Sequence, residues 1–141
     1  MKTLLFALGM SLGLLIATPA ITQKVSPSSS FTAGTVGPVI FLCSTLNGVE
    51  TIREITEKRE GVSEAEQNIT VTTGLQRLIN SNECGRLPGL MPFRLIKAHF
   101  AFVDWQGDYI VAWEGVMDNS QDKRHYFSPL VDNDAHPKNE I

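Results

Sequence analysis

Cysteine, histidine and positive charge are all scarce in this sequence, and each shortage narrows the functions that it allows. The 141 residues include 2 cysteines and 3 histidines, and 12 basic residues stand against 15 acidic ones, a formal net charge of −3. A mildly acidic chain lacks the positive surface that holds phosphate backbones or anionic lipid headgroups. We therefore expect neither nucleic acid nor a membrane surface among its partners.

Sequence motifs for metal and cofactor binding are absent as well. No Cys-x-x-Cys, His-x-His or Glu-x-x-His pair occurs, and neither the phosphate-loop nor the dinucleotide-binding glycine pattern is found. Structural zinc needs three or four ligands, which commonly come in closely spaced pairs. We therefore predict no metal site and no cofactor.

Long apolar runs are missing except near the first residue. A charged start at Lys2 precedes an apolar stretch from Thr3 to Ala17, and small residues follow up to Ala20. This order predicts a secretory signal peptide over residues 1–20. An uncleaved anchor is the alternative, but the apolar stretch covers about 15 residues, whereas a helix needs about 20 to span a bilayer. We expect a periplasmic or secreted protein that is free of the membrane after cleavage.

Export gives the two cysteines a structural explanation. Cys43 and Cys84 would share an oxidising compartment, in which a disulfide between them is favoured. Such a bond closes a loop of about forty residues, which on the chain-entropy model contributes roughly 4 kcal/mol to stability. Thiol catalysis is the alternative, but neither cysteine has a histidine within ten positions of it. We therefore predict a structural Cys43–Cys84 disulfide.

The distribution of polar and apolar residues divides the exported chain into three parts. Residues 21–35 are mostly polar, with one proline and one isolated aromatic residue, and predict a flexible leader. Residues 131–141 contain almost nothing apolar and predict a loose C-terminal tail. Residues 36–130 lie between them and suffice for a single domain.

A strand and two helices are predicted for the first half of this domain. Residues 39–42 form a short apolar run that is typical of a buried strand. Thr45 then precedes a helix, in which apolar residues recur along one face. These residues are Leu46, Val49, Ile52 and Ile55.

The second helix is expected to begin after Ser63. Ser63 and Glu66 have the spacing of a capping box, which predicts a helix that runs towards Asn80. Residues 69–73 are rich in β-branched side chains and precede Gly74, and both features are unfavourable inside a helix. Helix is still the preferred prediction there, with a break near Gly74 or a short strand over 69–73 as the alternative.

The second half of the domain favours strands. Residues 87–92 carry the glycine and prolines of an irregular connection, and strands are predicted over 93–103, 109–117 and 125–127, where Pro129 would end the last one. The predicted fold is α+β: one short N-terminal strand, two helices, then a three-stranded antiparallel meander, closed by one disulfide. In the strand over 93–103, one side of the pleat would carry Ile96, Ala98, Phe100 and Phe102.

Several short motifs together resemble a group of small exported bacterial proteins of unassigned function. The motifs are Leu42-Cys43, a polar-capped helix from Thr45 to Lys58, the turn Asn82 to Gly85, and a hairpin over residues 93–116. The resemblance covers most of the exported domain. It implies an exported domain with a Cys43–Cys84 pair and supplies no catalytic residues.

The predicted function is a small, non-enzymatic binding or interaction domain whose partner is a protein of unknown identity. Trp105 lies in a turn where polar residues are usual, and loop aromatics often anchor partners. Folding of Trp105 back onto the sheet is the competing explanation, and an open sheet edge is a second contact that the fold offers. The alternative function is a small exported hydrolase that uses His99 or His125 with a carboxylate. In that case the histidine and the carboxylate should converge in a cleft.

Overall fold

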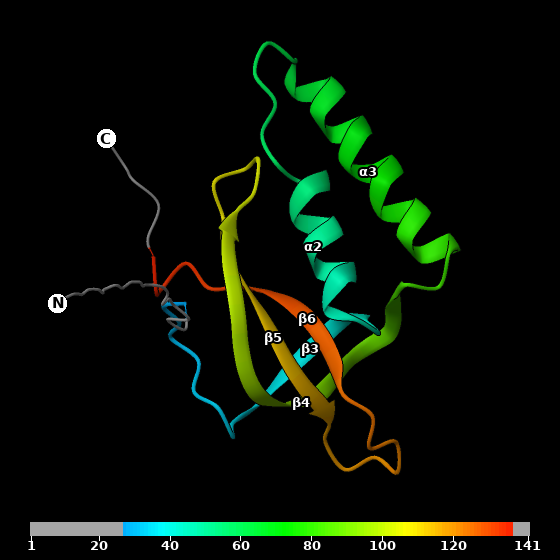
Figure 1. The fold of residues 1–141 in the computed structure, drawn as a ribbon, viewed down its shortest axis with the longest axis vertical. Coiled ribbons are helices and arrows are strands. Elements are labelled where there is room, and N and C mark those ends of the chain that lie inside the picture. Colours follow the sequence, from blue (N-terminus) through cyan, green and yellow to red (C-terminus); the bar gives the residue numbers. More distant parts are fainter. Residues whose placement is uncertain (1–26, 137–141) are drawn as a thin grey trace, which may run out of the picture.

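The structure is a computed structural model that describes residues 27–136. The predicted signal peptide over residues 1–20 and the end of the predicted tail lie outside these residues. No helix among the described residues is long and apolar enough to cross a membrane. Within 27–136 the chain forms, in order, β3 (Val36–Cys43), α2 (Leu46–Ile55), α3 (Glu64–Asn80), β4 (Cys84–Val103), β5 (Tyr109–Met117) and β6 (Tyr126–Val131) (Figure 1).

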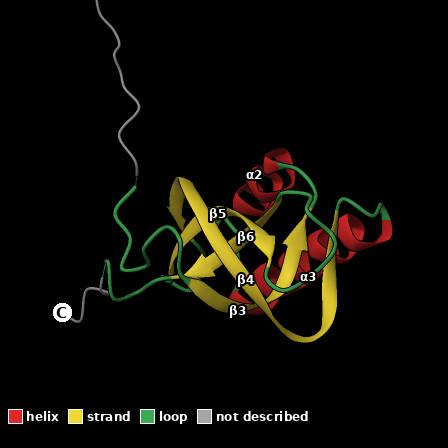
Figure 2. Ribbon diagram, turned by 90° about the horizontal axis from the view of Figure 1, so that it is seen from below, coloured by secondary structure: helices red, strands yellow, loops and turns green. Residues whose placement is uncertain are grey.

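The four strands form a closed antiparallel barrel in the order β3-β4-β5-β6. β4, β5 and β6 make the predicted three-stranded meander, and the α+β class is confirmed. The first strand also belongs to this sheet, because β3 pairs with β4 along its length and with β6 at Cys43 and Phe127. That single pair closes the barrel. Both helices lie on one side of it (Figure 2).

β4 is longer than predicted, because it begins at Cys84 and includes the expected irregular connection 87–92. Its first half pairs with β3, and its second half pairs with β5. The turn-forming residues are accommodated by a bulge: Val39 pairs with Met91 and Phe41 with Arg86. The residues of β4 between these pairs leave the ladder, where glycine and proline cost little.

Two further bulges bend β4 where it changes partners. The register against β5 shifts between Leu95 and Lys97, and again between Ala98 and Phe100. Each shift moves the following side chains to the other face of the strand. The predicted side shared by Ile96, Ala98, Phe100 and Phe102 is therefore wrong. Ala98 packs in one core cluster, whereas Phe100 and Phe102 pack in the other.

Two hydrophobic clusters stabilise the domain. The first fills the barrel and contains strand residues, with Phe93, Val111 and Trp113 at most 3% exposed. The second lies between the barrel and the helices, where Val49, Ile52 and Leu78 pack against Phe102, Ile110 and Ala112.

Both helices begin at the predicted caps. The Thr45 side chain accepts from the Gly48 N–H, and Ser63 and Glu66 form the capping box. Residues 69–73 are helical, as preferred, and Gly74 has a packing role there. A Cβ at Gly74 would lie 2.8 Å from Ile55 Cγ2, so glycine allows α3 to approach α2.

The predicted Cys43–Cys84 disulfide is present and joins two neighbouring strands. Cys43 and Cys84 are directly paired across β3 and β4, with their Cα atoms 3.9 Å apart. A Cβ at Gly48 would lie 3.1 Å from Cys84 Sγ, so the bond also lies against α2. The disulfide therefore ties β3 directly to β4.

The described parts of the predicted leader and tail, residues 27–35 and 131–136, make contacts that a flexible leader and a loose tail would not make. β6 continues through Pro129 to Val131, and Asp132 beyond it is 2% exposed. The Asp132 carboxylate accepts from the hydroxyls of Ser29 and Ser30, and from the Ser30 N–H. Polar residues in both segments are thus hydrogen-bonded to each other against the barrel, although their composition is that of unpacked chain.

Candidate functional site

Trp105 lines a pocket between the β4–β5 turn and the α2–α3 loop. These two loops lie side by side at the upper end of the molecule in Figure 1. The pocket has a volume of about 510 Å³, within the range of ligand pockets in proteins. Trp105 is half-buried, and its indole N–H donates to Asn68 Oδ1 at 3.1 Å. The lining residues are Lys58, Arg59, Val62, Glu64, Gln67, Trp105 and Gln106.

The β4–β5 turn that carries Trp105 is held by its own backbone and by Asp104. Asp104 Oδ1 accepts from the Gln106 N–H at 2.9 Å and from the Asp108 N–H at 3.0 Å. The backbone of Asp104 also exchanges hydrogen bonds with Gly107 and Asp108. Gly107 has φ +87°, a conformation that favours glycine. The expectation that Trp105 folds back onto the sheet differs from the structure, in which its indole bonds to α3.

Gln67 fixes the other wall of the pocket. Its side chain is 4% exposed, accepts from the Arg59 N–H at 2.9 Å and donates to the Glu57 carbonyl at 3.2 Å. One buried amide therefore holds the α2–α3 loop against α3. A buried amide that lost these bonds would be costly, which favours this conformation of the loop. Both walls of the pocket are thus tied by hydrogen bonds.

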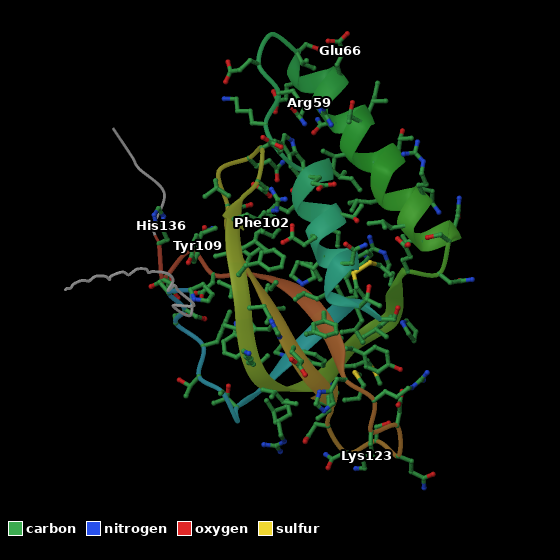
Figure 3. All side chains as sticks on the ribbon, in the orientation of Figure 1. Arg59, Glu66, Phe102, Tyr109, Lys123 and His136 are labelled. Carbon is green, nitrogen blue, oxygen red and sulfur yellow. A yellow bond between two sulfur atoms is a disulfide. The ribbon has the colours of Figure 1, made fainter. Side chains whose placement is uncertain are left out.

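The sequence did not indicate that Lys58 and Arg59 line this pocket. Lys58 and Arg59 precede Gly61 in a connection between two helices, and such charges normally face solvent. Figure 3 shows Arg59 at this loop, beside the start of α3. The only signal of a binding site in the sequence was Trp105 in the facing β4–β5 turn. Nothing in the spacing of residues 58 and 105 indicates that the two loops meet.

A second polar cluster joins His99, Glu114 and His125. His99 Nε2 lies 2.7 Å from Glu114 Oε1, and His125 Nδ1 lies 2.5 Å from Glu114 Oε2. His99 comes from β4, Glu114 from β5, and His125 from the residues just before β6. His99 and Glu114 are each 19% exposed, whereas His125 is 51% exposed. Both carboxylate oxygens of Glu114 are therefore occupied.

The bulge in β4 places His99 in this cluster. His99 is the extra residue between the pairs Ala98–Trp113 and Phe100–Ala112. Its ring meets the ring of Phe127 edge to face, with centroids 5.7 Å apart. Bulges commonly redirect a side chain in this way. The sequence named His99 and His125 as candidates, but it left the carboxylate partner open.

The electrostatics of the cluster follow from its hydrogen bonds. Bonds from His125 and His99 hold the pKa of Glu114 below its usual value, against the opposing effect of burial. The carboxylate is therefore ionised at neutral pH. A carboxylate on Nδ1 of His125 leaves Nε2 as the nitrogen for proton transfer, as in the histidine of hydrolytic triads.

The two functional candidates named from the sequence are thus in separate places. The pocket at Trp105 is lined by none of the three residues of the histidine cluster. Within residues 27–136, no group of three or more histidine, cysteine, aspartate or glutamate side chains is placed to hold a metal ion. In the histidine cluster, each bonded imidazole nitrogen faces a carboxylate oxygen.

Comparison of the chain with protein-family models, with curated proteins and with solved structures finds no match. The resemblance to small exported bacterial proteins therefore stays a prediction.

Proposed function

We propose that this protein is a small, exported, non-enzymatic binding domain, periplasmic or secreted, whose pocket at Trp105 holds a segment of a partner protein. The observation that carries the proposal is the position of Trp105 in a pocket whose two walls are tied by hydrogen bonds. Aromatic side chains in such pockets dominate the energetics of many protein interfaces. The Cys43–Cys84 disulfide supports the exported part of the proposal, because stable disulfides are rare in reducing compartments.

The other contact expected from the sequence was an open sheet edge. β3 closes onto β6 at Cys43 and Phe127, and Pro129 in β6 has no N–H to offer an added strand. The pocket at Trp105 therefore supports the binding function better than strand addition does.

The test is a selection of random peptides on the disulfide-bonded domain, with Trp105→Ala as the counter-selected variant. We expect enriched peptides that bind the wild-type domain and bind Trp105→Ala at least about tenfold more weakly, as for loss of an interface anchor. Circular dichroism should show that the variant keeps its fold. Enriched peptides that bind both proteins equally would contradict the proposal, and so would a selection without any enrichment.

The alternative function, a small hydrolase, rests on the histidine cluster. His125 would act as a general base on a water molecule through Nε2, while Glu114 orients its ring through Nδ1. The cluster lies outside the pocket at Trp105, which leaves this candidate without a described substrate pocket. A panel of chromogenic esters, amides and glycosides is the test. Turnover that falls at least about a hundredfold in His125→Gln would support a hydrolase, whereas equal background rates in both proteins would exclude it for these substrates.

A further inference from the structure

The side chains of the two cations in the pocket at Trp105 have no partner among residues 27–136. Among residues 27–136, Arg53, Arg94 and Arg124 each form an ion pair with a nearby carboxylate. No side-chain hydrogen bond or ion pair is found for Lys58 or Arg59, although the surrounding loop and first helical turn are rich in glutamate. These glutamates are Glu57, Glu60, Glu64 and Glu66.

The apolar part of the pocket comes from Trp105 and Val62. Val62 is 36% exposed and Trp105 is half-buried, so both present apolar surface beside the cations. A ligand that fits both parts has an apolar group and a negative group in close proximity. Arginine pairs well with planar carboxylates, because its guanidinium presents two N–H donors in parallel.

The start of α3 argues against phosphate as the negative group. The Glu66 N–H is already bonded to the Ser63 hydroxyl, and the Gln67 N–H to the Ser63 carbonyl. Glu64 and Glu66 place two negative charges in the first helical turn. The Glu66 and Gln67 N–H groups are therefore unavailable to a phosphate, whose charge these two glutamates also repel more strongly than that of a carboxylate. A carboxylate can pair with the side chains of Lys58 and Arg59 alone.

We propose that the pocket at Trp105 binds an acidic peptide segment in which an apolar side chain is followed by carboxylates. The apolar side chain packs on Trp105 and Val62, and the carboxylates pair with Lys58 and Arg59. A pocket of about 510 Å³ accommodates a few peptide residues. This inference rests on the proposed function and names the chemistry of the partner.

The probe is an end-blocked, fluorescein-labelled peptide of sequence Gly-Ser-Phe-Glu-Glu-Gly, measured by fluorescence anisotropy on the disulfide-bonded domain. Lys58→Gln/Arg59→Gln is the test variant. Arg77→Gln/Lys123→Gln is the matched control, because it removes two exposed cations without side-chain partners from other surfaces. A second peptide replaces both glutamates with glutamine, and a third replaces phenylalanine with glycine.

We expect the test variant to bind the first peptide about tenfold more weakly or worse, and the control to change its affinity less than about twofold. The wild-type domain should bind the glutamine and glycine peptides with a similar loss. Equal losses in the test and control variants would overturn the inference, because long-range charge alone would then explain the binding. Absence of binding by the first peptide at millimolar concentration would overturn it as well.

The variant Trp105→Ala separates this inference from the proposed function. If peptides from the random selection need Trp105 but bind Lys58→Gln/Arg59→Gln normally, the pocket is a binding site for another chemistry and the acidic-segment inference fails alone. If no peptide depends on Trp105, the proposed function fails. Added inorganic phosphate should compete only at the level of general salt screening.

Discussion

The two polar clusters of this domain differ in how far their charges are satisfied. Glu114 uses both carboxylate oxygens, one for His99 and one for His125, and is 19% exposed. Lys58 and Arg59 line a pocket without any side-chain partner among the described residues. A satisfied cluster contributes to stability by itself, whereas unpaired charges beside a half-buried aromatic ring are available to a ligand. This difference is the reason why we propose the pocket at Trp105, and not the histidine cluster, as the binding site.

Loss of Glu114 tests the satisfied cluster and has the largest expected effect. Glu114→Ala removes the acceptor of two imidazole N–H groups, and we expect the free energy of unfolding to fall by about 2 kcal/mol. Urea denaturation at neutral pH measures it. Glu83→Ala, which removes an exposed glutamate, should stay within about 0.5 kcal/mol of wild type. An equally small effect of Glu114→Ala would mean that the cluster is not a stabilising one.

The pH dependence of stability sharpens the same point. Hydrogen bonds from His125 and His99 lower the folded-state pKa of Glu114 from its usual value of 4.5. Its contribution is therefore fully present above pH 4.5, and it is lost as the pH falls through the lower, folded-state pKa. Glu114→Gln should reduce the slope of the free energy of unfolding against pH below about 4.5. Identical slopes in both proteins would contradict the assigned hydrogen bonds.

Asp132 adds a second acid-sensitive group, which Glu114→Gln leaves in place. Burial raises its pKa, but hydrogen bonds from Ser30 and Ser29 outweigh burial and lower it below 3.8. The variant should therefore retain part of the acid dependence. A complete loss of pH dependence in Glu114→Gln would be inconsistent with this contact.

Gln67 tests whether the pocket is preformed, with an intermediate expected effect. Gln67→Ala removes the bonds to the backbone of Glu57 and Arg59, which should cost about 1–2 kcal/mol of unfolding free energy. It should also weaken peptide binding, because the α2–α3 loop loses its fixed conformation. Gln76→Ala on the exposed face of α3 is the control. Unchanged peptide affinity in Gln67→Ala would show that the loop is held by other contacts.

The smallest stability effect is expected for the unpaired cations. Lys58→Gln/Arg59→Gln should change the free energy of unfolding by no more than about 0.5 kcal/mol, because both side chains lack partners in the part of the chain that the structure describes. Thermal unfolding of the two proteins at the same ionic strength measures this. A clear loss of stability would indicate that these cations pair within the domain, which would remove the basis of the acidic-segment inference.

Local signals in the sequence were sufficient to predict where the two helices begin. The caps at Thr45 and Ser63 act through neighbouring backbone N–H groups, so their geometry is set within four residues. The start of β4 could not be derived in the same way. Residues 87–92 have the composition of a loop, but they belong to β4, because a bulge against β3 absorbs residues 87–90.

The sequence predicted individual residues of the candidate sites, but not the residues that they contact. Trp105 stood out because an aromatic residue in a polar turn is unusual, and His99 and His125 because histidines are few. The sequence could not predict the partners of these residues, because each partner lies on a different helix, strand or loop. Glu114 meets His99 through a β-bulge, and Arg59 faces the turn of Trp105 through the packing of α3 on the barrel.

The most direct test of the binding site uses the two tryptophans of the chain as internal reporters. Trp105 lines the pocket, whereas Trp113 is 3% exposed in the barrel core. In ¹⁵N–¹H correlation spectra, each indole N–H gives its own signal during titration with the Gly-Ser-Phe-Glu-Glu-Gly peptide. We expect the Trp105 indole signal and the backbone signals of residues 58–67 to shift, while the Trp113 signal stays in place. Shifts centred on His99, Glu114 and His125, or no shift at all, would contradict the account.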